Sequence, residues 1–252
     1  MADNNIIIRN VKVVTPTGDS ARRGSSMSEL SVTGDASIVI TDGIITYVGP
    51  SDDIRIVADV DYNILEGDGN VALPGFVDSH THLIFGGFRP DEFEWRLKGD
   101  SYMSIMERGG GIQSTVNATR EESLDALVEK ARWFVDRMVE MGVTTVEAKS
   151  GYGLDTESEI KMLDAIDTIA RDENTPLSVV ATFLGAHAVP REYKGRTSEY
   201  IDLMIREMLP AVKGKAEFCD IFTEKNVFEI EDSRRFLTAA REAGFKLKLH
   251  AD

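Results

Sequence analysis

Cysteine, long apolar runs and a basic surplus are all missing or scarce in this sequence. The single cysteine, Cys219, cannot form a disulfide within the chain and fits a reducing compartment. No apolar run approaches the ~20 residues of a membrane span, and the first residues lack the basic start of a secretory signal. Lys and Arg number 28 against 43 Asp and Glu, and the net charge of −15 argues against nucleic-acid binding, since neutralising phosphates requires a surplus of Lys and Arg. We therefore expect a cytoplasmic protein that binds neither nucleic acid nor membranes.

Histidine is also scarce, yet all four histidines fall where a β-strand is predicted to end. His80 and His82 close the run at residues 73–82 (LPGFVDSHTH), and His187 and His250 close two further apolar runs. Alternate residues of a strand share a face, so His80 and His82 can chelate one divalent ion, and imidazole suits zinc and iron. The pattern predicts a metal site at the mouth of a β/α barrel. A chance His-x-His pair that binds nothing is the alternative.

The first 70 residues read as a small module of short strands. Apolar runs at residues 6–14, 37–41 and 44–48 predict strands, and the last two flank the turn pair at residues 42–43, a strong hairpin signal. Residues 15–36 are rich in Gly, Ser and Arg and predict an exposed loop. We expect residues 1–70 to form part of a β-sandwich domain.

Residues 71–252 alternate between strand-like and helical patterns. The strand-like runs start near Gly75, Val143, Leu177, Cys219 and Lys246. Helices are predicted at residues 119–138, 156–169, 198–212 and 233–243. The first two begin with the capping-box spacing, Thr119 with Glu122 and Thr156 with Glu159. Repeated βα units imply parallel strands with right-handed crossovers.

Five strands fall short of the eight that a closed (β/α)8 barrel requires. The fold class predicted here is therefore a (β/α)8 barrel truncated after about five strands and preceded by the β-sandwich module. We expect the chain to stop within the fold, since its last residues sit in a strand ending. A complete open α/β sheet of five strands is the alternative.

Several longer motifs extend this interpretation to a family. They are residues 74–82 (PGFVDSHTH), 85–89 (FGGFR), 91–93 (DEF), 108–116 (RGGGIQSTV), 149–154 (KSGYGL), 182–188 (TFLGAHA) and 250–252 (HAD). In this order they resemble the imidazolonepropionase family of the metal-dependent amidohydrolase superfamily. The resemblance runs almost unbroken from residue 73 onward and is weaker before it. The His-x-His pair alone would not distinguish among amidohydrolases.

The resemblance implies an activity and a metal centre. The activity is hydrolysis of the cyclic amide of 4-imidazolone-5-propanoate to N-formimidoyl-L-glutamate, a step of histidine degradation. One zinc or iron ion would be held by His80, His82 and His250, and the complete enzyme would be a homodimer. The resemblance also implies a general-base glutamate directly after Asp252 and a metal-binding aspartate after strand eight. Because this chain contains neither, it retains no catalytic residue of that kind, and we expect it to be inactive by itself.

Four residues are candidates for binding the small-molecule substrate. Arg89 lies in a Gly-flanked loop after the histidine pair. There its guanidinium can bind the propionate carboxylate of the substrate through two parallel N–H···O hydrogen bonds. Tyr152 lies in a loop after the second barrel strand, and His187 ends the third. By resemblance His187 contacts the imidazolone as a hydrogen-bond donor. Tyr102 is a weaker candidate. For each, a purely structural or solvated side chain is the alternative.

Other residues suggest rival functions. Lys149 and Glu224 raise the question of a second metal; Lys149 falls on the wrong strand, whereas Glu224 near the end of the fourth strand stays open. The three glycines at residues 109–111 lack the Gly-Lys-Ser/Thr of a phosphate-binding loop and predict a turn. Another amidohydrolase, such as a cyclic-amidine or nucleobase deaminase, is an alternative enzyme, although a deaminase has no propionate for Arg89. A non-catalytic metal-binding module is the alternative outside enzymes.

Overall fold

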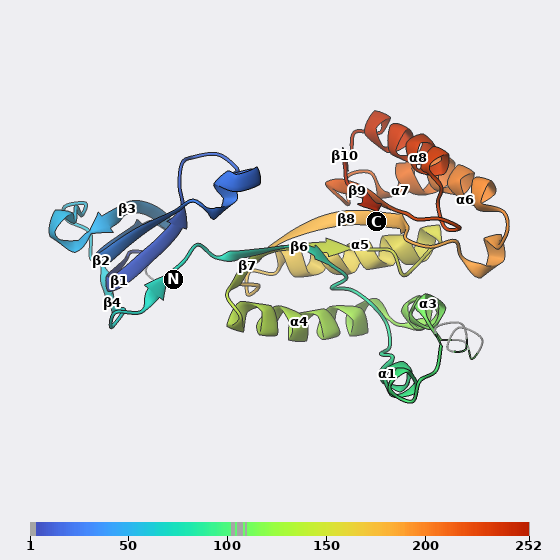
Figure 1. The fold of residues 1–252 in the computed structure, drawn as a ribbon, viewed down its shortest axis with the longest axis horizontal. Coiled ribbons are helices and arrows are strands. Elements are labelled where there is room, and N and C mark those ends of the chain that lie inside the picture. The colour runs from blue at the N-terminus through green and yellow to red at the C-terminus, as the bar shows by residue number, and fades with distance from the viewer. Residues whose placement is uncertain (1–3, 102–103, 105–107, 109, 252) are drawn as a thin grey trace. The chain divides into compact units, whose positions relative to one another are not determined.

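The computed structural model describes residues 4–101, 104, 108 and 110–251. The chain divides into two compact units, Met1–Gly75 and Phe76–Asp252 (Figure 1). The sequence places the boundary between residues 70 and 71. Each unit has its own sheet and its own cluster of buried apolar side chains.

The first unit is a five-stranded sheet. Its strands are β1 (Ile6–Pro16), β2 (Leu30–Thr41), β3 (Ile44–Pro50), β4 (Asn63–Glu66) and β5 (Val71–Ala72). They run in the order β3-β2-β1-β4, with β5 also paired to β1. The described residues of this unit form one hydrogen-bonded sheet, and that they are part of a β-sandwich domain stays a prediction. Val11, Val13 and Ala36 form its small core.

The hairpin of this unit is confirmed, and the long loop is corrected. Asp42 and Gly43 both have positive φ, as a two-residue hairpin turn requires, and they join β2 to β3. The loop expected at residues 15–36 is shorter than predicted, because β2 begins at Leu30 and pairs with the extended end of β1 as far as Pro16. Residues 17–29 contain only the short 3₁₀ helix η1 (Gly24–Ser28).

The second unit contains the parallel half-barrel that the sequence predicts. Its sheet has the order β10-β9-β8-β7-β6, and β11 extends the pairing of β10 along β9. All of these pairs are parallel. The strands are β6 (Phe76–Thr81), β7 (Val143–Lys149), β8 (Ser178–Ala186), β9 (Phe218–Thr223), β10 (Lys246–Leu247) and β11 (His250–Ala251).

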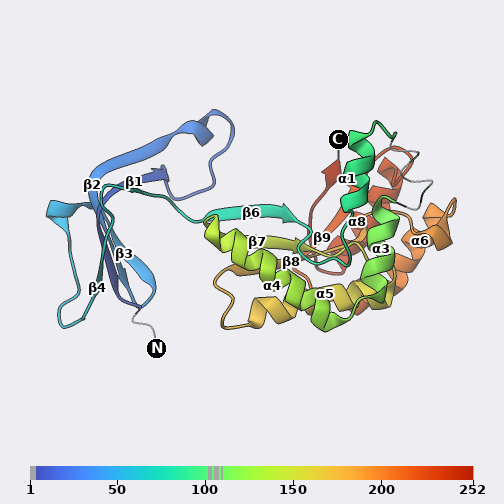
Figure 2. The same ribbon diagram turned by 90° about the horizontal axis from the view of Figure 1, so that it is seen from below.

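Helices connect these strands and cover the sheet. They are α1 (Pro90–Leu97), α3 (Ile112–Glu121), α4 (Leu124–Glu140), α5 (Thr156–Arg171), α6 (Thr197–Leu203), α7 (Leu209–Val212) and α8 (Ile230–Glu242). Helices α4 and α5 lie on the same side of the sheet (Figure 2), α4 against β7 and α5 against β8. The core buries apolar side chains of both layers, such as Leu127, Ile166 and Phe183. Within the described residues, no helix combines the length and apolar character that a membrane crossing needs.

Both predicted capping boxes are wrong. Thr119 lies inside α3, where its hydroxyl donates to Thr115 O and accepts from Gly86 N. The helix expected at residues 119–138 is therefore two helices, and α4 starts after Ser123, whose hydroxyl accepts from Ala126 N at 3.2 Å.

The second helix has a different N-cap from the one predicted. Asp155 caps α5 by accepting from Ser158 N at 2.7 Å, so Thr156 is already helical. The helix predicted at residues 198–212 is one run of α6, the π-helical turn η4 (Met204–Met208) and α7. The π turn ends two residues before Pro210, which cannot donate to a regular helical ladder.

Candidate functional site

The four histidines meet at one edge of the half-barrel. His80 lies near the end of β6, His82 just after it, His187 just after β8, and His250 at the start of β11. Parallel strands end at the same edge, so these side chains converge. Ring centroids lie 4.9 Å apart for His250 and His80, 6.1 Å for His80 and His82, and 4.5 Å for His82 and His187.

Burial favours the neutral form of three of these rings. It lowers the pKa of His82 to about 3, with the neighbouring His187 contributing next. It also lowers the pKa of His187 to about 4, and it lowers the pKa of His80. Neutral imidazole is the form that binds metals. The Nδ1 atom of His82 is buried and has no hydrogen-bond partner among the described residues, although buried polar atoms are nearly always paired.

One histidine pair has the spacing of two ligands that share an ion. Two imidazoles bound at ~2 Å to one tetrahedral ion place their ring centres about 5 Å apart. His80 and His250 lie 4.9 Å apart, whereas His80 and His82 lie 6.1 Å apart. Among the described residues, however, no three His, Cys, Asp or Glu side chains lie where they could together hold a metal ion. His82 instead stacks almost parallel on His187, with 11° between the ring planes.

A small cavity opens beside His82. Its volume is about 180 Å³, and it is lined by His82, Phe85, Phe88, Arg89, Thr115 and Tyr152. Three of the residues that the sequence singles out therefore share one cavity: a histidine of the predicted metal pair, the predicted carboxylate-binding arginine and the predicted substrate-binding tyrosine. The other wall is aromatic, as suits a flat ring.

Arg89 is held at the cavity by the helix that follows it. Arg89 is the N-cap residue of α1, and its Nη1 lies 3.3 Å from Oε2 of Glu92. The buried Glu92 also accepts a 2.6 Å hydrogen bond from Gly111 N through Oε1. The N–H of Gly111 is thus bonded to a carboxylate of the protein. In a phosphate-binding loop this N–H would have to be available to the phosphate. Arg89 remains about one-third exposed, at 35%.

Tyr152 and His187 are neighbours across two loops. Their ring centroids are 5.1 Å apart, and Tyr152 also lies 5.0 Å from His82. His187 Nδ1 lies 2.9 Å from Gly151 O; since a carbonyl only accepts, Nδ1 carries the proton. The sequence leads us to expect His187 as a donor to substrate, but the neutral ring in this tautomer presents Nε2 as an acceptor. Burial raises the pKa of Tyr152, which keeps its phenol protonated.

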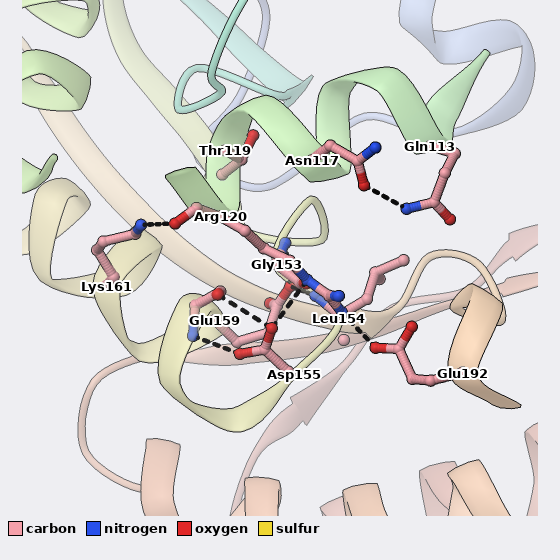
Figure 3. A network of polar contacts seen from close by, with 12 residues as sticks. Gln113, Asn117, Thr119, Arg120, Gly153, Leu154, Asp155, Glu159, Lys161 and Glu192 are labelled. Carbon is pink, nitrogen blue, oxygen red and sulfur yellow. Dashed lines mark hydrogen bonds and ion pairs between the residues drawn. The ribbon is translucent and has the colours of Figure 1, made fainter. Parts of the chain in front are cut away.

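A fully buried carboxylate, Glu159, organises this loop and is missed by the sequence analysis. Its two oxygens accept hydrogen bonds from the backbone amides of Gly151, Gly153 and Leu154 (Figure 3 shows the last two residues beside it). The spacing from Thr156 suggests instead that Glu159 closes a capping box. A buried acidic residue on the apolar face of α5 is the signal that could have revealed its role.

Lys149 is engaged in a buried ion network. Its Nζ lies 2.9 Å from Glu147 Oε1 and 2.7 Å from Asp220 Oδ2, and all three side chains are at most 3% exposed. Glu147 also accepts from Thr182 and Lys248. Lys149 therefore has two carboxylate partners inside the half-barrel, which supports the sequence-based view that it does not bridge metals.

The remaining candidates lie elsewhere. Glu224 follows β9, where its Oε1 accepts from Lys225 N and its side chain lines a different cavity, with Leu249 and Ala251. Tyr102, Gly109 and Asp252 lie outside the described residues.

Two solved structures show the fold to which this architecture belongs. A 5-methylcytosine deaminase from Klebsiella pneumoniae superposes with a TM-score of 0.61 at 16% identity, covering 97% of this chain and 51% of that one. The atrazine chlorohydrolase TrzN from Arthrobacter aurescens, solved as a mutant with zinc and atraton, gives 0.52 at 17% identity over 97% and 52% of the chains. The half-barrel with its preceding β-rich module is thus an amidohydrolase fold.

In sequence, the chain is similar to imidazolonepropionases along its whole length. An imidazolonepropionase of Phocaeicola vulgatus is 58% identical over 252 residues, 99% of this chain and 60% of that protein. One of Parabacteroides distasonis is 52% identical over 256 residues, 100% of this chain and 61% of that protein. The chain therefore spans about 60% of the length of the curated relatives it matches. No family model matches it.

Proposed function

We propose that the protein containing this chain hydrolyses the ring amide of 4-imidazolone-5-propanoate to N-formimidoyl-L-glutamate. The observation that carries the proposal is the single cavity shared by Arg89, Tyr152 and His82. It combines a carboxylate-binding group, a neutral hydrogen-bonding group and a candidate metal ligand. The names and the high identity of the relatives support the same reaction.

Arg89 binds the propionate of the substrate. The planar guanidinium presents donors in a fork that matches a carboxylate, and Arg keeps its charge at any physiological pH. Glu92 contacts Nη1 of this fork. Because Glu92 is itself fixed by Gly111 N, it orients the guanidinium and leaves its other edge for a ligand.

Tyr152 and His187 bind the ring. The phenol of Tyr152 donates a hydrogen bond, and Nε2 of His187 accepts one from a ring N–H, since its Nδ1 proton is committed to Gly151 O. Together with the aromatic wall at Phe85 and Phe88, they hold the imidazolone flat beside His82.

His80, His82 and His250 would hold one divalent ion, zinc or iron. The lowered pKa values of His80 and His82, the unpartnered Nδ1 of His82 and the ring separation between His80 and His250 support this assignment. A bound ion of this kind lowers the pKa of water toward ~7 and polarises an amide carbonyl. The chain's own residues place the scissile amide beside those histidines. Zinc is present in the atrazine chlorohydrolase neighbour. A homodimer and a cytoplasmic location stay predictions of the sequence.

The test is an assay of the protein extended to the full length of its relatives. We expect hydrolysis of imidazolone propionate and negligible release of ammonia from cytosine or guanine. A deaminase is the second enzyme class considered from the sequence, and its substrates carry no propionate for Arg89. Rapid nucleobase deamination with no ring opening of imidazolone propionate would replace the proposal by that alternative.

A further inference from the structure

The loop between β7 and α5 carries one proposed substrate-binding residue and supports another. Tyr152 lies within it, and the carbonyl of Gly151 accepts the Nδ1 proton of His187. The loop is closely packed: a Cβ atom at Gly151, where φ is +109°, would lie 2.9 Å from Leu184 O and 3.1 Å from His187 Cβ. A small shift of this loop therefore moves both side chains.

Glu159 satisfies the backbone of this loop. Its Oε1 accepts from Gly153 N and Leu154 N, each at 2.9 Å, and its Oε2 accepts from Gly151 N at 3.1 Å. The hydroxyl of Ser150 adds a further hydrogen bond. A carboxylate has acceptor sites for all four donors, and no other side chain of this length accepts through both terminal atoms.

The position of Glu159 is costly for the helix that carries it. Glu159 is 0% exposed, and the neighbouring positions on α5, Met162, Leu163 and Ile166, are apolar and buried. Burial of a carboxylate is unfavourable and raises the pKa of Glu159. An apolar residue would pack here at lower cost, so the carboxylate's contribution lies in the loop that it holds.

Arg120 holds the same loop through a backbone carbonyl. Arg120 Nε donates to Gly153 O at 2.7 Å, and the same guanidinium pairs with Asp155 at 2.8 Å and Glu192 at 2.7 Å (Figure 3). Gly153 is thus fixed through both its N–H, by Glu159, and its carbonyl, by Arg120. Two side chains, Arg120 of α3 and Glu159 of α5, thus hold the backbone of Gly151, Gly153 and Leu154.

We propose that Glu159 is a positioning residue that fixes the 151–154 loop, and through it Tyr152 and His187, for substrate binding. The proposal rests on the function proposed above for Tyr152 and His187. Glu159 touches no substrate; it acts by presenting its acceptors to the loop amides.

The first test is Glu159→Gln in the full-length protein, with Glu157→Gln as the matched control. Gln keeps the size but replaces one acceptor by an NH₂ donor that faces a loop N–H. Glu157 is exposed in the first turn of α5 and loses the same charge without touching the loop. We expect kcat/KM per folded protein to fall roughly 10- to 100-fold for Glu159→Gln, as for other residues that orient a site, and to stay unchanged for Glu157→Gln. Bound metal should be unchanged in both.

A double-mutant cycle identifies the route of the effect. If Glu159 acts through the loop, the loss caused by Glu159→Gln should shrink in a Tyr152→Phe, His187→Ala background, because those contacts are already gone. An undiminished loss in that background, or a Glu159→Gln protein as active as the Glu157→Gln control, would overturn the proposal.

Amide hydrogen exchange tests positioning without relying on activity. The amides of Gly153 and Leu154 should exchange as slowly as those in the middle of α5 in the wild type, and much faster in Glu159→Gln. Fast exchange in the wild type contradicts the proposal even where Glu159→Gln does not fold. If the wild type opens no imidazolone ring, the proposed reaction fails, while the exchange result still decides whether Glu159 fixes the loop.

Discussion

At the scale of single residues, His80 occupies the centre of the histidine group. Its ring lies beside those of His82 and His250, whereas His187 contacts His82 alone among the histidines of the described residues. We predict about one zinc or iron ion per chain in the full-length protein. His80→Ala should abolish stoichiometric binding, and His187→Ala should leave the metal content near the wild-type value. Metal analysis of dialysed protein provides the measurement.

Two outcomes would contradict this assignment. Retention of a full equivalent by His80→Ala would remove His80 from the ligand set. Two equivalents in the wild type would require further ligands, and Glu224 would then be the first carboxylate to replace.

At the scale of elements, the start of α4 depends on a cap that the sequence pattern misassigns. Ser123 supplies the capping oxygen. Ser123→Ala should lower the free energy of unfolding by about 1 kcal/mol, whereas Ser123→Gly should cost only a few tenths. Denaturant unfolding of the two variants measures the difference. Equal losses for Ala and Gly would show that the hydroxyl does not cap the helix.

The strand and helix order could be predicted from the sequence because it depends on local patterns. Apolar runs and the positions of Gly142 and Gly244 indicate the ends of α4 and α8, and all four histidines do lie at one edge of the sheet. The same reasoning could bring Arg89 and Tyr152 toward that edge, since both follow barrel strands. It could not show that they share a cavity with His82.

The two wrong capping-box predictions share a physical cause. The Thr-x-x-Glu spacing describes a local capping box, but in both cases a side chain has partners outside that box. Thr119 bonds the distant Gly86 amide, and Glu159 accepts from amides of the loop that precedes α5. The spacing alone encodes neither contact. The same holds for the pairing of Lys149 with Asp220, which lie 71 residues apart.

At the scale of the whole half-barrel, the buried ion network ties strands together. Lys149 and Glu147 belong to β7, Asp220 to β9, and Lys248 follows β10. Lys149→Met leaves two buried carboxylates short of a partner, so we predict a loss of about 3–5 kcal/mol in the free energy of unfolding. Adding Glu147→Gln and Asp220→Asn should recover most of it. A single mutant as stable as the wild type would show that the network contributes little.

This network also predicts a dependence of stability on acid pH. Burial alone would raise the pKa of Glu147, but hydrogen bonds from Lys248, Thr182 and Lys149 bring it below its usual 4.5. A depressed carboxyl pKa stabilises the fold above the unfolded pKa, and this contribution is lost as the pH falls through the folded value. The free energy of unfolding of the wild type should therefore decline below about pH 4.5, and that of the Glu147→Gln variant should decline less. Equal acid slopes in chemical denaturation would contradict the assignment.

The most direct test of the proposed function is the steady-state hydrolysis of imidazolone propionate by full-length wild type and Arg89→Lys. Lysine keeps the positive charge but loses the fork that grips a carboxylate. We predict that KM rises by about tenfold or more, with a smaller fall in kcat, because ground-state binding suffers first. Arg96→Lys, the same change at an exposed position of α1, is the control and should behave as wild type. Turnover by the wild type with an unchanged KM in Arg89→Lys would remove Arg89 from the carboxylate site and contradict the account.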